Sequence, residues 1–364
     1  MSGIPKVLVP WCRKQSHHSR SSAVGVKRLA TTTLFCYAAA AATLRHRSSL
    51  FAMAFSSSTC GSSTAEGPLS LVLQQKRTDE PPVVPSHPLV ELHHIKEPIG
   101  STQDEVRRIL LENENETTTN GRFVTVIADQ QQAGRGTNGR NWEASQGNLY
   151  MTMGIPMDKI PVMLTMLPLQ IAVLVSQRAD LVLDHCAAST TLDRTRVKWP
   201  NDVLLNDAKL SGTLIESVSV QNQSWFLIGI GVNVQHAPSL TSTPGKQIRP
   251  AVSLQDYCDE TQEFSLPPYT ALYFGVDLAY ALADWVTENA SVPRAQANQA
   301  VLDAWKAKAE FGKAYEIRSN NVEDESNGSY QGERVVAVDI APDGQLKIRG
   351  ADGQERLLVA DYFF

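Results

Sequence analysis

With 364 residues, of which 42% are hydrophobic and 20% charged, the chain can bury a core of two ordinary domains, which excludes wholesale disorder. The formal net charge is −5, from 33 basic and 38 acidic side chains, and this excludes a protein dedicated to general nucleic-acid binding.

The first 65 residues differ in composition from the rest. They contain no Asp or Glu but eight basic side chains, and they are rich in Ser, Thr and Ala. This composition is typical of an organellar targeting leader, for a plastid or a mitochondrion, and a start at Met53 would give a shorter, cytosolic form. Without the leader, 25 basic residues face 38 acidic ones, so the body carries a formal charge of −13.

Three of the five cysteines lie in the leader, which leaves Cys186 and Cys258 in the body. These two form no CxxC motif and have no metal-ligand spacing. We therefore expect reduced thiols and no structural zinc. Residues 66–90 contain five prolines and no clear periodicity, which predicts a linker.

The first predicted elements of the body are a helix and two strands. Thr102 and Glu105 fit a capping box that opens a helix through Val106–Leu111. Residues 123–128 and 149–155 are short apolar runs typical of buried strands. Residues 162–183 form the most apolar stretch, but Pro168 and Arg178 are among the residues that interrupt it. This favours a buried helix over a membrane span.

The second half of the chain predicts strands, then helices, then strands. Strands are expected at 195–199, 203–205, 210–216 and 225–234, with a turn at Asn206-Asp207, and residues 236–252 are expected to form a surface loop. Residues 269–310 have helical periodicity with a break near 291–293. Four short strands follow, at 313–318, 334–340, 346–349 and 356–360. Asp-Gly turns at 343–344 and 352–353 make this a small all-β module.

A glycine-rich segment at 134–139 matches GxGxxG, but a strand rather than a helix follows it, which argues against a dinucleotide-binding fold. Arg135 and Arg140 alternate with the glycines. Such a loop can bring backbone N–H groups and guanidinium groups to a phosphate or carboxylate. The alternative interpretation is a flexible surface loop.

A second motif combines two lysines with an amide and a carboxylate. Lys198 ends a strand before Trp199-Pro200, Asn201 and Asp202 follow, and Lys209 comes just after the next turn. These side chains could hold a triphosphate and its Mg²⁺. The alternative is an ordinary hairpin with solvated lysines.

Two shorter signals point to ligand contacts. Gly229 and Gly231 lie inside a predicted strand, which indicates either close approach of a ligand or tight sheet packing. Ser101, Thr102 and Gln103 at the helix start either cap the helix or hold a polar ligand head.

Taken in order, these segments resemble the catalytic domain of biotin–protein ligases, also called holocarboxylase synthetases or biotin–[acetyl-CoA-carboxylase] ligases. The segments are STQ at 101–103, QQQAGRG at 130–136, RNW at 140–142, KWPND at 198–202, KLSG at 209–212 and GIGVN at 229–233.

The resemblance implies an α+β fold. A mixed-sheet, class II synthetase-like catalytic domain of the biotin/lipoate ligase type would occupy residues 91–310, and a small SH3-like β-barrel would occupy residues 311–364. The leader (1–65) and the linker (66–90) precede them.

The resemblance implies a two-step activity. Biotin and Mg-ATP give biotinyl-5′-AMP and pyrophosphate, and the biotinyl group then passes to one lysine of a biotin carboxyl carrier domain of a carboxylase, with acetyl-CoA carboxylase the expected partner. Mg²⁺ enters with ATP, and biotin is a substrate. No DNA binding and no membrane attachment are expected, and the protein would be a monomer or a homodimer.

The same resemblance implies roles for individual residues. Positions that contact biotin are Ser101, Thr102, Gln103, Gln131, Gly134, Arg135, Gly136 and Lys209. Positions that contact ATP are Arg140, Trp142, Lys198, Asn201 and Asn233, with Mg²⁺ expected near Asn201 and Asp202. Lys209, Arg135 and Asp202 are the expected catalytic residues.

The chemistry agrees with this set. Because biotin's carboxylate is ionised at neutral pH, the first step needs charge screening, which Arg135, Lys209 and Mg²⁺ can supply, rather than a base. The second step needs a neutral lysine amine, and Asp202 is the expected proton acceptor. Thr137 and Asn138 stand where many bacterial members carry basic residues, so this loop is less positive.

Two alternatives remain at this point. A lipoate–protein ligase or octanoyltransferase shares the fold, but the GRGTNGRNW loop argues against these families. A non-catalytic binding protein is disfavoured because the glycine loop and both lysines occur in one chain.

Overall fold

The computed structural model describes residues 67–74, 82–112, 121–186, 194–220, 222–239, 249–262, 265–316 and 333–358. The predicted leader and the start at Met53 lie outside these residues, and the predicted boundaries between domains stay predictions.

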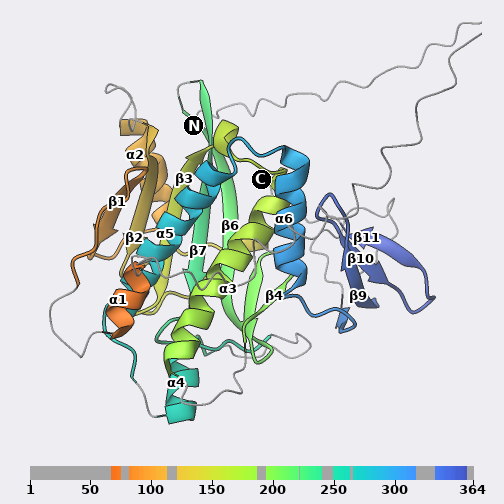
Figure 1. The fold of residues 1–364 in the computed structure, drawn as a ribbon. Helices are drawn as coiled ribbons and strands as arrows, with labels where there is room; N and C mark the ends of the chain where they lie inside the picture. The colour runs from red at the N-terminus through yellow and green to blue at the C-terminus, as the bar shows by residue number, and fades with distance from the viewer. Residues whose placement is uncertain are drawn as a thin grey trace, which may run out of the picture. The chain divides into compact units, whose positions relative to one another are not determined.

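A seven-stranded sheet has the order β1-β2-β3-β7-β6-β5-β4 (Figure 1). β1 runs parallel to β2, whereas the other neighbouring pairs are antiparallel, so the sheet is mixed, as predicted. The strands are β1 Val90–Ile95, β2 Phe123–Ala128, β3 Leu149–Pro156, β4 Arg196–Lys198, β5 Asp202–Leu205, β6 Ala208–Val220 and β7 Gln223–Val232. The predicted turn joins β5 to β6, with positive φ angles of 48° at Asn206 and 63° at Asp207.

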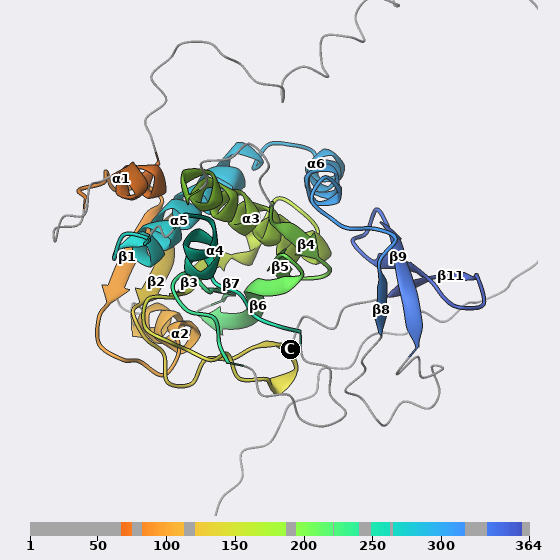
Figure 2. The ribbon, with the colours of Figure 1, turned by 90° about the horizontal axis from the view of Figure 1, so that it is seen from below.

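Helices cover both faces of this sheet (Figures 1 and 2). α3 (Leu167–Cys186) and α5 (Thr270–Glu288) pack on one face, and α2 (Thr102–Glu112) packs on the other. β2 is buried on both sides: Phe123 and Ile127 join the core under α3 and α5, whereas Val124 and Val126 join the core under α2. Burial on both faces explains why this strand has no polar alternation.

The most apolar stretch forms α3, as predicted, after a short 3₁₀ turn at Leu164–Met166. Residues 164–186 are long and apolar enough to cross a membrane by length and composition, but 78% of the apolar window is buried inside the fold. α3 therefore acts as the central core helix, and α6 (Arg294–Lys306) packs beside it. α5 and α6 are separated near 289–293, where the sequence predicts a break.

Part of the segment predicted as a linker packs on the core. α1 (Pro68–Gln74) buries Leu69, Val72 and Leu73 against α5, and the Leu69 N–H donates a hydrogen bond to Asp277 (3.2 Å). Farther along, Tyr280 on α5 donates to the carbonyl of Pro85 (3.1 Å). The segment differs from a free linker because the i, i+3, i+4 spacing of its apolar residues gives α1 one buried face.

The C-terminal strands form a separate antiparallel sheet of order β11-β10-β9-β8. They are β8 Ala314–Glu316, β9 Arg334–Ile340, β10 Leu346–Arg349 and β11 Glu355–Leu358, with Gly344 and Gly353 at positive φ in the predicted turns. The expected SH3-like barrel stays a prediction, since the described strands establish only the sheet. Trp199, which directly follows β4, donates its indole N–H to the carbonyl of Gly344 (2.9 Å) and so connects this sheet to the larger one.

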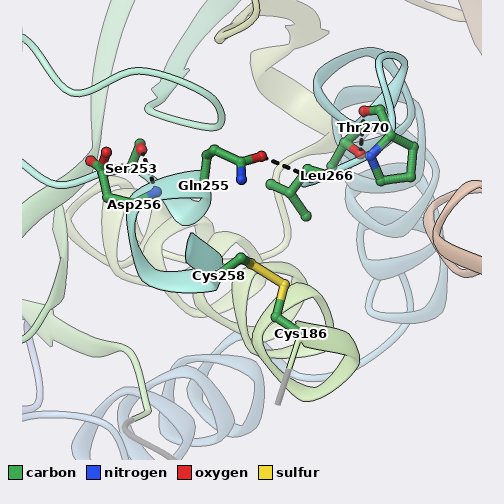
Figure 3. Close-up of a disulfide and its surroundings, with 8 residues drawn as sticks. Cys186, Ser253, Gln255, Asp256, Cys258, Leu266 and Thr270 are labelled. Carbon is green, nitrogen blue, oxygen red and sulfur yellow. Dashed lines mark hydrogen bonds between the residues drawn. A yellow bond between two sulfur atoms is a disulfide. The ribbon is translucent and has the colours of Figure 1, made fainter. Parts of the chain in front are cut away.

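Cys186 and Cys258 form a disulfide, so the prediction of two reduced thiols is wrong (Figure 3). Cys186 is the last residue of α3, and Cys258 lies on α4 (Leu254–Gln262), a helix that packs against α3. Their Cα atoms are 5.4 Å apart, and both residues are buried. A separation of 72 residues forms no sequence motif, so only the packing of α4 on α3 reveals the pair.

α4 itself was not predicted, although its sequence carries a start signal. The Ser253 N–H donates to the carboxylate of Asp256 (2.9 Å), and the Asp256 N–H donates to the hydroxyl of Ser253 (3.0 Å, Figure 3). This reciprocal pair is a capping box with Asp in place of Glu.

Reduction of the disulfide should destabilise the protein. In the chain-entropy account, a cross-link that closes a long loop contributes about 2–4 kcal/mol. We expect dithiothreitol to lower the urea midpoint of the wild-type protein and to leave the midpoint of the Cys186→Ala/Cys258→Ala variant unchanged. An equal midpoint for wild-type protein with and without reductant would contradict the cross-link.

Candidate active site

Glycines on one face of β7 form the floor of a groove. Trp225 and Leu227 pack under α2, and Gly229 and Gly231 continue the same face because alternate residues of a strand share a face. Gly231 lies opposite Gly212 on β6. The missing side chains open the sheet surface where the core under α2 ends.

The start of α2 supplies uncharged polar groups at the Gly229 end. A Cβ atom at Gly229 would lie 3.1 Å from the side chain of Gln103, whose amide donates to the carbonyls of Leu214 (3.2 Å) and Leu227 (3.4 Å). The side-chain oxygen of Gln131 accepts hydrogen bonds from the Thr102 N–H (2.7 Å) and hydroxyl (3.1 Å). These groups can recognise a polar ligand head without adding charge.

The helix cap differs from the prediction. Ser101, not Thr102, precedes the helix, and its hydroxyl accepts the Gln103 N–H (3.3 Å). Glu105 instead pairs with Arg108 on the exposed side of α2. The Thr102 hydroxyl instead contacts the side-chain oxygen of Gln131 (3.1 Å) and the hydroxyl of Thr152 (2.8 Å).

Trp142 covers the Gly231 end of the groove. A Cβ atom at Gly231 would lie 2.6 Å from the indole, and one at Gly212 would lie 3.0 Å from it. The ammonium of Lys209 lies 5.4 Å from the indole centroid. The indole N–H is buried and has no hydrogen-bond partner among the described residues.

Cations gather beside this aromatic ring. Lys209 forms an ion pair with Asp202 (2.7 Å), and Lys198 lies 3.9 Å from the same carboxylate. Burial lowers the pKa of Lys198, and the positive charges of Arg249, Lys209 and Arg140 lower it further, against the attraction of Asp202. An anion such as a polyphosphate would stabilise this cluster, because its negative charge would offset the repulsion among the cations.

The structure brings many of the predicted site residues to this groove, although it does not test their roles. Those that line it are Ser101, Thr102, Gln103, Gln131, Arg135, Gly136, Trp142, Asn201 and Lys209. Asp202 and Lys198 adjoin Lys209 through the ion pairs described above.

Three predicted residues have structural partners of their own. The carbonyl of Gly134 accepts a hydrogen bond from the Trp142 N–H (2.9 Å). The guanidinium of Arg140 donates to the carbonyl and hydroxyl of Thr137 within the loop. Asn233 is buried and donates to the carbonyls of Lys209 and Val252, both at 3.2 Å. Asn233 therefore fixes the backbone that carries Lys209.

Sequence reasoning missed two residues at the site. Tyr150 lines the groove opposite Gly231, and burial raises its pKa to about 12, so its hydroxyl stays protonated and donates to the carbonyl of Ser145 (2.7 Å). Arg249 adds positive charge near Lys198 and donates to the carbonyl of Asp207 (2.8 Å). An isolated arginine after a surface loop carries no motif, whereas the i, i+2 pattern of β3 could have indicated Tyr150.

No group of three or more His, Cys, Asp and Glu side chains is placed to hold a metal ion within the part of the chain that the structure describes. Asp202 is the carboxylate beside Lys209, and the Asn201 amide lines the same groove. This oxygen set suits an ion that arrives with phosphates better than a resident metal.

Comparisons with known proteins agree with this geometry. Residues 99–233 match the Biotin/lipoate A/B protein ligase family. A biotin–[acetyl-CoA-carboxylase] ligase of Paracoccus denitrificans is 30% identical over 246 residues, which are 66% of this chain and 89% of that protein. An enzyme of the same name from Mycobacterium tuberculosis is 36% identical over 119 residues, 32% of this chain and 41% of that protein.

Among solved structures, a biotin protein ligase from Aquifex aeolicus in complex with biotin and ATP is 18% identical, with a TM-score of 0.50, and the match covers 74% of this chain and 96% of that one. This likeness concerns the fold, and the matched family model assigns that fold to the Biotin/lipoate A/B protein ligase class. The relatives narrow the class: the chain belongs to the biotin–protein ligase family and is a ligase.

The glycine floor is testable through stability. Gly231→Ala would place a methyl group against the indole of Trp142, and such overpacking costs about 1–3 kcal/mol. Gly100→Ala is the matched control, because nothing lies within 4 Å of a Cβ atom there. Urea unfolding should show a lower midpoint for Gly231→Ala only; equal midpoints for the two variants would show that the indole does not rest on this floor.

Proposed function

We propose that the protein forms biotinyl-5′-AMP from biotin and Mg-ATP and then transfers biotin to one lysine of a biotin carboxyl carrier domain, with acetyl-CoA carboxylase as the expected partner. The observation that carries the proposal is the division of one groove into two ends. Uncharged donors and acceptors lie over Gly229, and an aromatic ring with two lysines lies over and beside Gly231.

The spacing of the two ends suits a carboxylic acid with a polar head. Gly229 and Gly231 are two residues apart on one strand, or about 7 Å. A head bound by Thr102 and Gln131 would extend its chain along the glycine floor and place its carboxylate near Lys209.

In the first step the protein has to bring two anions together. Biotin's carboxylate attacks the α-phosphorus of ATP, pyrophosphate leaves, and no proton is transferred. Lys209 can lie between the carboxylate and the α-phosphate, and Lys198 can contact the departing phosphates. These charges stabilise the transition state more than the separate substrates, because the two anions approach closely there and negative charge moves onto the oxygen of the departing pyrophosphate.

Mg²⁺ enters this scheme as part of Mg-ATP and neutralises phosphate charge when bound. The Asn201 and Asp202 side chains can supply oxygen ligands from one edge of the groove. The face of the Trp142 indole can stack on the adenine.

The second step needs a neutral amine. A free lysine has a pKa of about 10.4, so roughly one molecule in 2,500 is neutral at pH 7. Asp202 can accept the proton as the amine attacks the mixed anhydride and AMP leaves. Because Asp202 pairs with Lys209 (2.7 Å), it would lie near the activated carbonyl if Lys209 contacts the carboxylate of biotin.

The full-length chain should release pyrophosphate with biotin and Mg-ATP and should label a biotin carboxyl carrier domain. Lipoate and octanoate are the competing acids to test in parallel. Pyrophosphate release with lipoate and none with biotin would replace this proposal with lipoate ligation.

Lys209→Ala should lower the rate of pyrophosphate release by roughly 100-fold, because one charge is lost between two anions. The control is Lys159→Ala, at an exposed lysine on the 3₁₀ turn after β3. Thermal unfolding of both variants verifies that they fold. An unchanged rate in a folded Lys209→Ala protein would refute the assignment.

Asp202→Asn should still form the adenylate but should transfer it roughly 100-fold more slowly, because the amide accepts no proton. Asp207→Asn, on the adjacent turn, is the control. Single-turnover transfer of preformed adenylate to the carrier domain measures this step. Loss of adenylation with normal transfer would contradict the role of Asp202.

A further inference from the structure

Four charged side chains of alternating sign lie beside the groove and form what we call the α2–β6 charge cluster: Asp104 and Arg107 on α2, Arg135 on the glycine loop and Glu216 on β6. The guanidinium of Arg135 makes two parallel hydrogen bonds to the carboxylate of Asp104 (2.8 and 2.9 Å), and it lies 3.3 and 3.4 Å from the oxygens of Glu216. Arg107 contacts the same two carboxylates, at 3.1 and 2.9 Å.

The glycine loop, residues 134–142, is closed on itself. The N–H of Gly136 donates to the carbonyl of Arg140 (2.7 Å), and the N–H of Trp142 donates to that of Gly134 (2.9 Å). The guanidinium of Arg140, the other loop arginine, donates hydrogen bonds to the carbonyl and hydroxyl of Thr137 inside the loop. Arg135 is therefore the charged side chain that joins the described part of this loop to α2 and β6.

This arrangement changes what Arg135 can do. Two carboxylates balance its charge, and its hydrogen bond lowers the pKa of Asp104, so Asp104 stays ionised at neutral pH. An arginine held in this way contributes less charge to substrate anions than Lys209 and Lys198 do. Its planar fork instead fixes direction, because two parallel hydrogen bonds restrict the guanidinium.

We propose that Asp104 and Glu216 are positioning residues that hold the glycine loop over the groove through Arg135, and that they set how long the acyl-adenylate stays bound. Gly136, Thr137 and Trp142 of this loop line the groove, so release of the loop uncovers the ligand. The proposal rests on the proposed function, and it assigns Arg135 to retention of the intermediate rather than to charge screening.

The first test needs no ligand. Trypsin cleaves after Arg135 and Arg140 only when the loop leaves the surface, so cleavage there reports loop release. Partly exposed ion pairs contribute up to about 1 kcal/mol each, so Glu216→Gln and Asp104→Asn should each raise cleavage roughly three- to fivefold, and the double variant more. The rate at which tryptic peptides from the rest of the chain appear serves as the internal reference for the cleavage rate.

The second test measures the dissociation rate of radiolabelled biotinyl-5′-AMP formed on the full-length protein. The same variants should release it roughly three- to fivefold faster, while the first-turnover rate of pyrophosphate formation stays unchanged. Rising salt should speed release from the wild-type protein more than from the double variant, because salt screens the cluster.

Glu105→Gln is the matched control, because Glu105 is the next residue on α2 and pairs with Arg108 rather than with the loop. Arg135→Lys, which keeps the charge but loses the fork, should fall between wild-type protein and the variants.

The proposal is overturned if cleavage and release in Asp104→Asn and Glu216→Gln equal the wild-type values, or if Glu105→Gln changes them equally. A wild-type protein that makes no adenylate would instead refute the proposed function, and the trypsin test would still decide whether the cluster holds the loop.

Discussion

The close approach of the Trp142 indole to the glycines of β6 and β7 is the constraint on which the rest of the site depends. A Cβ atom at Gly231 would collide with the ring and one at Gly212 would crowd it, so these glycines let the loop that carries Trp142 cross the sheet closely here. That crossing brings the loop to Lys209, whose ammonium faces the same ring. Glycine usually weakens a strand because it adds backbone freedom and has no side chain to pack. At these positions the missing side chains leave a groove in a sheet surface that is otherwise filled.

The opposite face of the sheet supports this geometry. Ile228 and Ile230 alternate with the groove glycines and enter the core under α3 and α5. α4 begins directly after the segment that hydrogen-bonds Asn233 and Lys209, and the disulfide ties α4 to α3. The backbone beneath Lys209 is therefore connected to the central helix, which limits how far this catalytic candidate can shift.

The charge that the site offers to a ligand depends on the ion-pair partners of its cations, not on the net charge of the protein. The body carries a formal charge of −13, yet the groove presents cations to its ligands. The reason is that the cations of the site differ in how many carboxylates surround them. Arg135 faces two carboxylates in the α2–β6 charge cluster, whereas Lys198 and Lys209 share Asp202. An added anion can thus lower the repulsion around Lys198 but finds Arg135 already neutralised. Basic residues of these motifs therefore suit different roles. Lys198 and Lys209 suit phosphate binding, whereas Arg135 suits holding the loop.

The sequence by itself determined most helices and strands of the body, whereas the mixed α+β class and many of the residues that line the groove followed from the resemblance of its motifs to biotin–protein ligases. It did so because periodicity, turn residues and local motifs are short-range properties: the Asn206-Asp207 turn and strand 334–340 are where the pattern predicts them. Only the tertiary structure decided the disulfide, the packing of α1 on α5, the role of Ser101 as helix cap and the pairing of Arg135 with Asp104 and Glu216. Most of these contacts join residues distant in sequence, and their geometry exists only after α2, β6 and the helices have packed.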